Sequence, residues 1–412
     1  MAGAGTPRPQ GYRPSPDVSR SRHTRFPVAA LLSVGFVLAA TTLPVFVMGS
    51  MARSLGADPR FERLDVTAAV TVFFACSALS APVSGVVADR VGAAWSLTLA
   101  AVASAGAAAT LAGLGDPRPA VALMGLAGAA NVLAQTSGNL VLADQGSPRY
   151  AGAAFGIKQS AVPVATMLAG LAVPLFDSAG QWRMAFAACA VLVIGSTVVA
   201  LLVIRKSRPR RARSPAGVID RRLVAALAVA AFLATGTATS VVIYFVSFAA
   251  AYGVDAGTAG LVLACAGAIG VALRVGSGVA LDRVSRAARS RAPLRCASAM
   301  VIVGAMGTAL LAASAHTPVL MSCGVVLAVG VGWSWPGLMH LVIVDRNRGA
   351  AGRATGIVLA GVFGGSVTMP ALSEVLVDAT SYPVTWLAGS GCMAVAAAMF
   401  ALAGTPRRSP RE

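Results

Sequence analysis

Twelve long apolar segments, separated by short polar stretches, fill most of the chain. Each is close to the roughly 20 residues that an α-helix needs to cross about 30 Å of hydrocarbon. They lie at about 26–49, 66–87, 94–114, 119–143, 151–176, 182–204, 223–251, 257–281, 293–314, 318–344, 353–376 and 382–403. The sequence therefore predicts an all-α integral membrane protein with twelve transmembrane helices.

The composition agrees with a membrane protein. Only 12% of the residues are charged and 57% are hydrophobic, whereas a soluble domain carries about a quarter charged residues. The net charge of +18 comes from short basic runs between apolar segments rather than from an aromatic-studded patch, so we expect a lipid bilayer around the chain and no nucleic-acid partner. The six cysteines show no metal-ligand or redox spacing, and we expect no metal and no cofactor.

Polar stretches divide the chain into two halves. Residues 1–25 are rich in Pro, Ser, Gly and Arg and are predicted to be a disordered tail. The basic stretch 205–222 has no apolar periodicity and is interpreted as a linker between 26–204 and 223–404, each with six apolar segments. A short basic tail, 405–412, ends the chain.

Charge is distributed unevenly across the predicted membrane. If the segments alternate in direction, 26 of the 33 Lys and Arg residues fall on the side that holds both termini. The positive-inside rule then places both termini in the cytoplasm, and we expect a multi-pass, monomeric protein of the plasma membrane. The opposite side holds Arg53, Arg60, Arg63, Arg118 and Arg183 together with Asp58, Glu62, Asp65, Asp116, Asp177, Asp255, Glu374 and Asp378.

The two halves share an internal repeat. The turn Ser84-Gly85-Val86-Val87-Ala88-Asp89-Arg90-Val91-Gly92 recurs in large part as Ser277-Gly278-Val279-Ala280-Leu281-Asp282-Arg283. Two further matches follow in the same order, Asn139 to Asp144 with His340 to Asp345, and Arg149 and Gly156-Ile157 with Arg353 and Gly356-Ile357. Three matches in register predict two diverged six-helix bundles.

These features together carry a resemblance to a known family. The turn with Gly85, Asp89, Arg90 and Gly92, its copy at Gly278, Asp282 and Arg283, the twelve segments and the basic linker resemble the major facilitator superfamily of secondary transporters. The resemblance implies two pseudo-symmetric bundles that work by alternating access around a central cavity. The Gly156 to Ser160 and Leu43 to Phe46 stretches are also similar to the branch that includes cyanate-type permeases.

The resemblance also implies a conformational latch at the two turns. Asp89 is expected to meet the start of the helix near residue 353, with Arg353 as its ionic partner, and Asp282 the start of the helix near residue 151, beside Arg149. A glycine at position 85 is expected to allow close helix packing. The alternative is a solvated turn. The predicted latch residues are Gly85, Asp89, Arg90, Gly92, Gly278, Asp282, Arg283, Arg149 and Arg353.

Polar and aromatic side chains within apolar segments are candidates for the substrate cavity, because polar groups are costly in hydrocarbon. Each has an alternative role: amides can tie helices together, a lysine can extend to the membrane surface, and tryptophans can pack. Pro163 and Pro336 are expected to kink their helices. The cavity candidates are Asn131, Gln135, Asn139, Lys158, Gln159, Tyr244, Arg274, Trp333 and Trp335.

The charged side chains inside the apolar segments indicate which class of solute is transported. No Asp or Glu falls deep inside a segment, whereas Lys158 and Arg274 do, so we expect a small anionic or polar solute. His340 is the histidine inside a segment that could accept a coupling proton. An exporter of drug-like or natural-product molecules is the alternative, and a membrane sensor or scaffold is a remote one. No nucleophile and base pair lies within a segment, so an enzyme is not expected.

Overall fold

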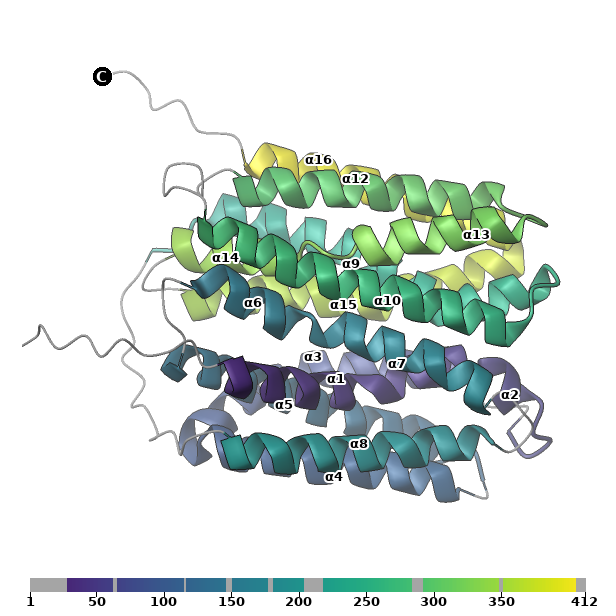
Figure 1. The fold of residues 1–412 in the computed structure, drawn as a ribbon, viewed down its shortest axis with the longest axis horizontal. Coiled ribbons are helices and arrows are strands. Elements are labelled where there is room, and N and C mark those ends of the chain that lie inside the picture. Colours follow the sequence, from purple (N-terminus) through teal and green to yellow (C-terminus); the bar gives the residue numbers. More distant parts are fainter. Residues whose placement is uncertain are drawn as a thin grey trace, which may run out of the picture.

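The computed structural model describes residues 28–61, 65–114, 116–145, 150–176, 181–203, 218–283, 292–347 and 351–404. The predicted tails, most of the predicted linker, and Arg149 lie outside the described residues. The helices run side by side along one axis (Figure 1). We call the end of the molecule where α1 begins and α16 ends the terminal end, and the end that carries α2 the distal end.

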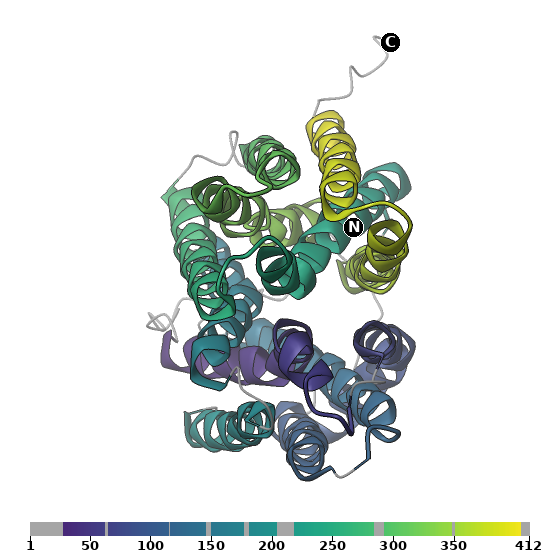
Figure 2. The same cartoon turned by 90° about the vertical axis from the view of Figure 1, so that its right-hand side faces the viewer.

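The helices of the two halves form two groups, seen end-on in Figure 2. The first half contains α1 (Val28–Ser50), α2 (Ala52–Gly56), α3 (Val66–Val91), α4 (Ala93–Gly113), α5 (Ala120–Gln145), α6 (Ala151–Gln159), α7 (Ala161–Phe176) and α8 (Trp182–Val203). The second half contains α9 (Arg221–Ala251), α10 (Ala256–Arg283), α12 (Ala292–Ala313), α13 (Pro318–Val325), the π-helix η2 (Val326–Val331), α14 (Pro336–Arg346), α15 (Ala351–Ala379) and α16 (Tyr382–Ala403).

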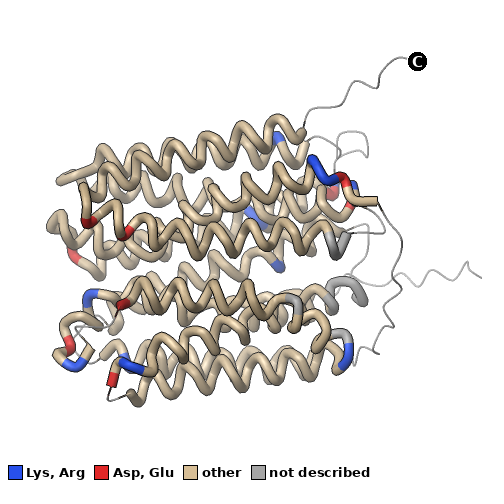
Figure 3. Tube along the Cα trace, turned by 180° about the vertical axis from the view of Figure 1, so that it is seen from behind, with Lys and Arg blue, Asp and Glu red and all other residues tan. Residues whose placement is uncertain are grey.

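The predicted fold class is confirmed. Eleven helical spans of the described chain are long and apolar enough to cross a membrane, and the shorter apolar stretch Val66–Ala81 of α3 supplies a twelfth. Charged residues gather at the two ends of the helices, with few between them (Figure 3). This distribution is what a hydrocarbon layer around the middle of the bundle requires.

Two of the twelve spans are broken, as the prolines predicted. The span that starts at Ala151 is interrupted at Ser160, three residues before Pro163, and α14 begins anew at Pro336 after the π-helix. Proline has no backbone N–H, so the carbonyl four residues earlier loses its helical donor. Both breaks therefore leave backbone carbonyls that other groups must satisfy.

The most buried helices are α1 and α9, which belong to different halves. Every residue from Val37 to Ser50 and from Ala234 to Ile243 is buried. These segments are the distal part of α1 and the middle of α9, so the two helices run through the centre of the molecule. At the turn between α3 and α4, Gly92 has a φ of 84°, which explains why a glycine ends the first copy of the turn.

Candidate functional site

The amide face of α5 changes from buried to exposed toward the terminal end. Asn131 is buried, and its Nδ2 donates to the hydroxyl oxygens of Thr41, at 3.2 Å, and Thr42, at 2.8 Å, on α1. Gln135 is partly buried and Asn139 is exposed. Asn131 therefore joins α5 to α1, while the next two amides of the same face remain accessible. Sequence reasoning did not include the two threonines, although adjacent hydroxyls in an apolar helix were a visible signal.

Lys158 on α6 is a buried cation. Only 6% of its surface is exposed, and within the described part of the chain no hydrogen bond or ion pair engages its ammonium group. On the same helix Phe155 and Gln159 face α14, and the carbonyl of Ile157 lies against Gly35 of α1. One side of α6 therefore faces α14 and another lies against α1. Lys158 lies between these two sides, so its side chain points toward the interior between α1 and α14.

His340 on α14 meets the first half beside Lys158. Its Nδ1 lies 2.8 Å from the carbonyl oxygen of Pro336 and 3.0 Å from Nε2 of Gln159, and its ring stacks on Phe155 at 6.3 Å. The ring is also within electrostatic range of the Lys158 ammonium. The Pro336 carbonyl can only accept and the Gln159 Nε2 can only donate, so the tautomer of the neutral ring decides which of the two contacts of Nδ1 is a hydrogen bond.

Arg274 on α10 satisfies the carbonyls exposed at both helix breaks. Its Nε, at 3.1 Å, and Nη2 donate to the carbonyl oxygen of Trp333, and Nη1 donates to that of Gln159. Its side chain is buried, and its guanidinium lies 5.7 Å from the centre of the Trp333 ring. The guanidinium thus connects the break in the first half with the break in the second half. We expected this cation to face the cargo; instead, three of its N–H groups bind the backbone.

The remaining cavity candidates lie in different places. The Trp333 ring packs edge-on against Phe46 of α1, at the interface between the halves. Trp335 is fully buried, with its ring 4.9 Å from the ring of Phe400 on α16, and its place in the cavity wall stays a prediction. Tyr244 lies near the distal end of α9, where its hydroxyl oxygen is 2.6 Å from that of Thr67.

The second copy of the turn closes tightly on α6. The Asp282 carboxylate accepts the backbone N–H groups of Gly152, at 2.9 Å, and Ala153, at 2.8 Å. These amides begin a helix, where unpaired N–H groups and the helix dipole attract a carboxylate. A side chain at Gly278 would overlap the Gly152 backbone, and one at Gly156 would overlap the Arg274 carbonyl. The glycines therefore let α6 and α10 come into backbone contact.

The first copy of the turn is packed differently. A Cβ added at Gly85 on α3 would have no atom of the described residues within 4 Å, and the same is true of Gly356 on α15. The close packing expected at Gly85 therefore has no counterpart among the described residues and stays a prediction. The side chains of Asp89 and Arg353 lie outside the described part of the structure, while Arg90 and Arg283 are exposed.

Comparison with known proteins identifies the family. The sequence matches the family model of the Major Facilitator Superfamily over residues 29–358. This chain belongs to that superfamily. Its fold is similar to the crystal structure of a mutant of the nucleoside transporter NupG, with a TM-score of 0.67 and 15% identity over 92% of this chain and 98% of that chain. No curated protein sequence matches it.

The superfamily consists of secondary transporters, so the chain is a membrane transporter rather than an enzyme. Its cargo is a small-molecule solute. Within the described residues, no group of three His, Cys, Asp or Glu side chains is placed to hold a metal ion.

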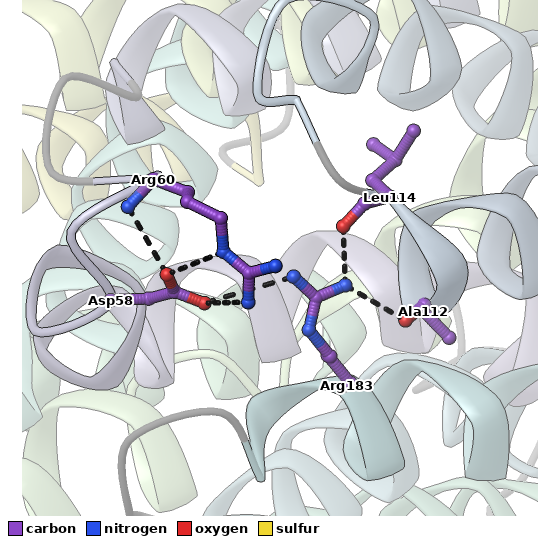
Figure 4. Close-up of polar contacts among 5 residues, drawn as sticks. All are labelled: Asp58, Arg60, Ala112, Leu114 and Arg183. Carbon is purple, nitrogen blue, oxygen red and sulfur yellow. Dashed lines mark hydrogen bonds and ion pairs between the residues drawn. The ribbon is translucent and has the colours of Figure 1, made fainter.

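A charged cluster at the distal end of the transporter was not predicted from the sequence (Figure 4). The Asp58 carboxylate pairs with Arg60 at 3.2 Å and with Arg183 at 3.7 Å. Hydrogen bonding from the Arg60 side chain holds the pKa of Asp58 below its usual range. Arg183 of α8 also donates to the carbonyl oxygens of Ala112, at 3.2 Å, and Leu114, which end α4. These contacts connect the segment that follows α2 to α4 and α8, all within the first half.

Proposed function

We propose that this transporter moves a small anionic or polar solute by alternating access between its two halves, 26–204 and 223–404. The observation that carries this proposal is the Lys158 ammonium, which is buried at the interface of the halves without a protein partner in the described chain. An unpaired charge in a low-dielectric interior is costly, and an anion or a strongly polar group would reduce that cost.

Neighbouring side chains support the same cargo class. Gln159 lies on the same turn of α6 as Lys158, and Gln135 on α5 is partly accessible. Such amides can donate to or accept from a polar solute. Arg274 adds a second positive charge behind Gln159, although its N–H groups are engaged with carbonyls. The described acidic residues of the spans lie near helix ends, so a cationic cargo has less support.

The proposed cycle uses the two turns as latches at the cytoplasmic surface. Asp282 on the first amides of α6 would hold one side of the terminal end closed, and Asp89 with Arg353 would do the same on the other side in an alternative state. The excess of basic residues at the terminal end supports cytoplasmic termini in a plasma membrane. The proposed working unit of this cycle is the monomer.

His340 is the residue proposed to couple transport to a proton. It contacts Gln159 across the interface and lies within electrostatic range of Lys158. Protonation of the ring would place a second cation beside Lys158 and change the contact with Gln159. An anion bound at Lys158 would offset that repulsion, which is a route to joint binding of solute and proton.

Uptake into proteoliposomes with an imposed pH gradient tests the cargo class. The probes are cyanate as a small anion, uridine as a polar solute of the class named for NupG, and tetraphenylphosphonium as an organic cation. Lys158→Met keeps the apolar stem and removes the charge, and it should lower uptake of the transported anion about tenfold, as loss of a charge-assisted contact implies. Arg53→Met, at an exposed distal cation, is the control and should leave uptake unchanged.

The result also separates the alternatives. Uptake of uridine that depends on Lys158 would assign the cargo to neutral polar solutes. Flux of the organic cation that persists in Lys158→Met would instead favour an exporter of drug-like molecules and would contradict the anion proposal. A transporter-fold sensor or scaffold would show no flux of any probe.

A further inference from the structure

The side chain of Asn131 is oriented by two threonines of α1. Its Nδ2 donates to the hydroxyl oxygens of Thr41, at 3.2 Å, and Thr42, at 2.8 Å. Each threonine hydroxyl in turn donates its single proton to the carbonyl oxygen of Leu38, at 3.2 Å for Thr41 and 2.7 Å for Thr42. The two hydroxyl oxygens are therefore left as acceptors, and only the N–H groups of the amide can bind them.

These hydrogen bonds decide which end of the amide is free. An asparagine side chain has two N–H donors on Nδ2 and one acceptor oxygen, Oδ1. The threonines take one N–H each, so the amide cannot turn over without placing its oxygen against their lone pairs. The Oδ1 atom accepts no hydrogen bond within the described part of the chain and is not completely buried. Asn131 therefore presents an acceptor, and no donor, to a molecule that binds beside it.

A polar face of α5 leads from the terminal end to this oxygen. Asn139 is exposed, Gln135 one turn deeper is partly buried, and Asn131 another turn deeper keeps 4% of its surface accessible. Residues four positions apart share one face of a helix, so the three amides form a single row. A solute that enters from the terminal end along α5 therefore passes the two outer amides before it reaches Asn131.

Lys158 and Asn131 lie at different depths in the molecule. The carbonyl of Ile157, the residue before Lys158, lies against Gly35 of α1. Thr42, which binds Asn131, follows Gly35 by seven residues. Seven residues of a helix are about 10 Å long. The two residues are therefore about two turns of α1 apart, with the lysine nearer the terminal end.

We propose that Asn131 sets the specificity of the cargo site by accepting a hydrogen bond from the solute. On the transport function proposed above, on which this assignment rests, the cargo is an elongated solute with an anionic group at one end and an N–H or O–H donor at the other. Lys158 takes the anionic end and Asn131 takes the donor. A solute with a methyl group in place of the donor removes water from Oδ1 without replacing its hydrogen bond, and it binds less tightly.

The affinities of two matched probes for the full chain in phosphatidylcholine nanodiscs test the assignment. Para-aminobenzoate carries a carboxylate and an amine at opposite ends, and para-toluate has a methyl group in place of the amine. The parent chain should bind para-aminobenzoate about tenfold more tightly in isothermal titration calorimetry, because the methyl group cannot donate to Oδ1. This comparison needs no variant that must fold. Equal affinities, or binding of neither probe, would overturn the proposal.

Variants of the amide and of its two supports separate a role in specificity from a structural tie between α1 and α5. Asn131→Leu should bind the two probes equally. Thr41→Val combined with Thr42→Val frees the amide to turn and should also remove the preference. Thr41→Ser combined with Thr42→Ser keeps both hydroxyls and should retain it. A tenfold preference that persists in Asn131→Leu or in the double valine variant would overturn the role of the oriented amide.

Lys158→Met distinguishes failure of this assignment from failure of the anion site. It should weaken the binding of both probes by the same factor and leave their ratio unchanged. If it weakens both while the parent chain binds them equally, the anion site stands and the assignment of Asn131 fails. If the parent chain prefers para-aminobenzoate and Lys158→Met changes neither affinity, the acceptor role of Asn131 stands and the anion site fails.

Discussion

The two copies of the turn have closely similar sequences and different surroundings. At the second copy, Gly278 packs on the backbone of Gly152, and Asp282 binds the first amides of α6. At the first copy, neither Gly85 nor Gly356 on α15 has an atom of the described residues within 4 Å of an added Cβ. We call the contact between α6 and α10 the second seam and the contact between α3 and α15 the first seam. The same motif therefore lies at a closed second seam and at a loose first seam.

The contrast extends along the helices. The second seam stays tight to its distal end, where Gly170 and Gly260 meet, and Arg274 joins α10 to α6 in between. At the distal end, Thr67 of α3 instead contacts Tyr244 of α9, the neighbour of α15. At the repeat position of Arg274 the first half has Ala81, which cannot form such a link. We infer that opening at the terminal end begins at the seam of α3 and α15.

The largest expected effect comes from placing a methyl group in the tight seam. Gly278→Ala should lower the free energy of unfolding by about 3 kcal/mol, because the new Cβ overlaps backbone atoms that cannot move aside. Gly85→Ala is the matched control and should be neutral or stabilising by about 0.5 kcal/mol, since its Cβ has space and alanine favours a helix. Thermal unfolding of the purified protein measures both. Equal losses would remove the distinction between the seams.

Removal of the Arg274 guanidinium should have the next largest effect. Arg274→Met leaves the carbonyls of Gln159 and Trp333 without these donors, and we expect a loss of about 2 kcal/mol in unfolding free energy. Arg274→Lys should recover only part of it, because one ammonium cannot reproduce the fork of donors. Ala81→Met is the control at the repeat position. Full recovery by lysine would show that charge alone is what the site requires.

Loss of the Asp282 carboxylate should have a smaller effect on stability. Asp282→Ala removes a group that binds two amides at the start of α6, which is worth about 1 kcal/mol for a helix cap. Asp282→Asn keeps one acceptor oxygen and should lose less. Hydrogen exchange of the Gly152 and Ala153 amides, measured by mass spectrometry of peptides from α6, should rise in Asp282→Ala. Unchanged exchange would mean that the carboxylate does not hold the seam.

The smallest expected effect is the loss of stability when acid weakens the charged cluster around Asp58. The pKa of Asp58 is lowered in the folded state by the Arg60 hydrogen bond, so this contact stabilises the fold above the ordinary carboxyl pKa of about 4. That stability is lost as pH falls through the lowered value. The unfolding temperature of the parent chain should therefore fall slightly more on acidification than that of Asp58→Asn. Parallel pH curves would show that the cluster contributes no measurable stability.

Much of the architecture followed from the sequence. Apolar length fixed the spans to within a few residues, and the two prolines predicted where two of them break, because the missing N–H groups are a local property. The carbonyl of Gln159, which Pro163 deprives of its helical donor, could also have suggested a donor such as Arg274. The resemblance to the superfamily implied that Asp282 meets the start of α6, although the latch role assigned to it stays a prediction.

Other parts of the site could not be read from the sequence. Which seam is tight depends on the angle between the two halves, and the turns at Gly85 and Gly278 share the Ser-Gly-Val start and the Asp-Arg pair. The direction of Trp335 depends on its packing against Phe400 of α16, a contact between distant segments. The link from Asn131 to Thr41 and Thr42 likewise needs the relative rotation of α1 and α5.

Distances across the two seams at the terminal end test the central claim most directly. One pair of spin labels, at Val86 and Ile357, spans the seam of α3 and α15, and the other, at Ile157 and Ala280, spans that of α6 and α10. In nanodiscs, the first pair should give a broad distribution with a long component and the second pair a narrow, short one. Equally narrow distributions for both pairs would contradict the account of one loose and one closed seam.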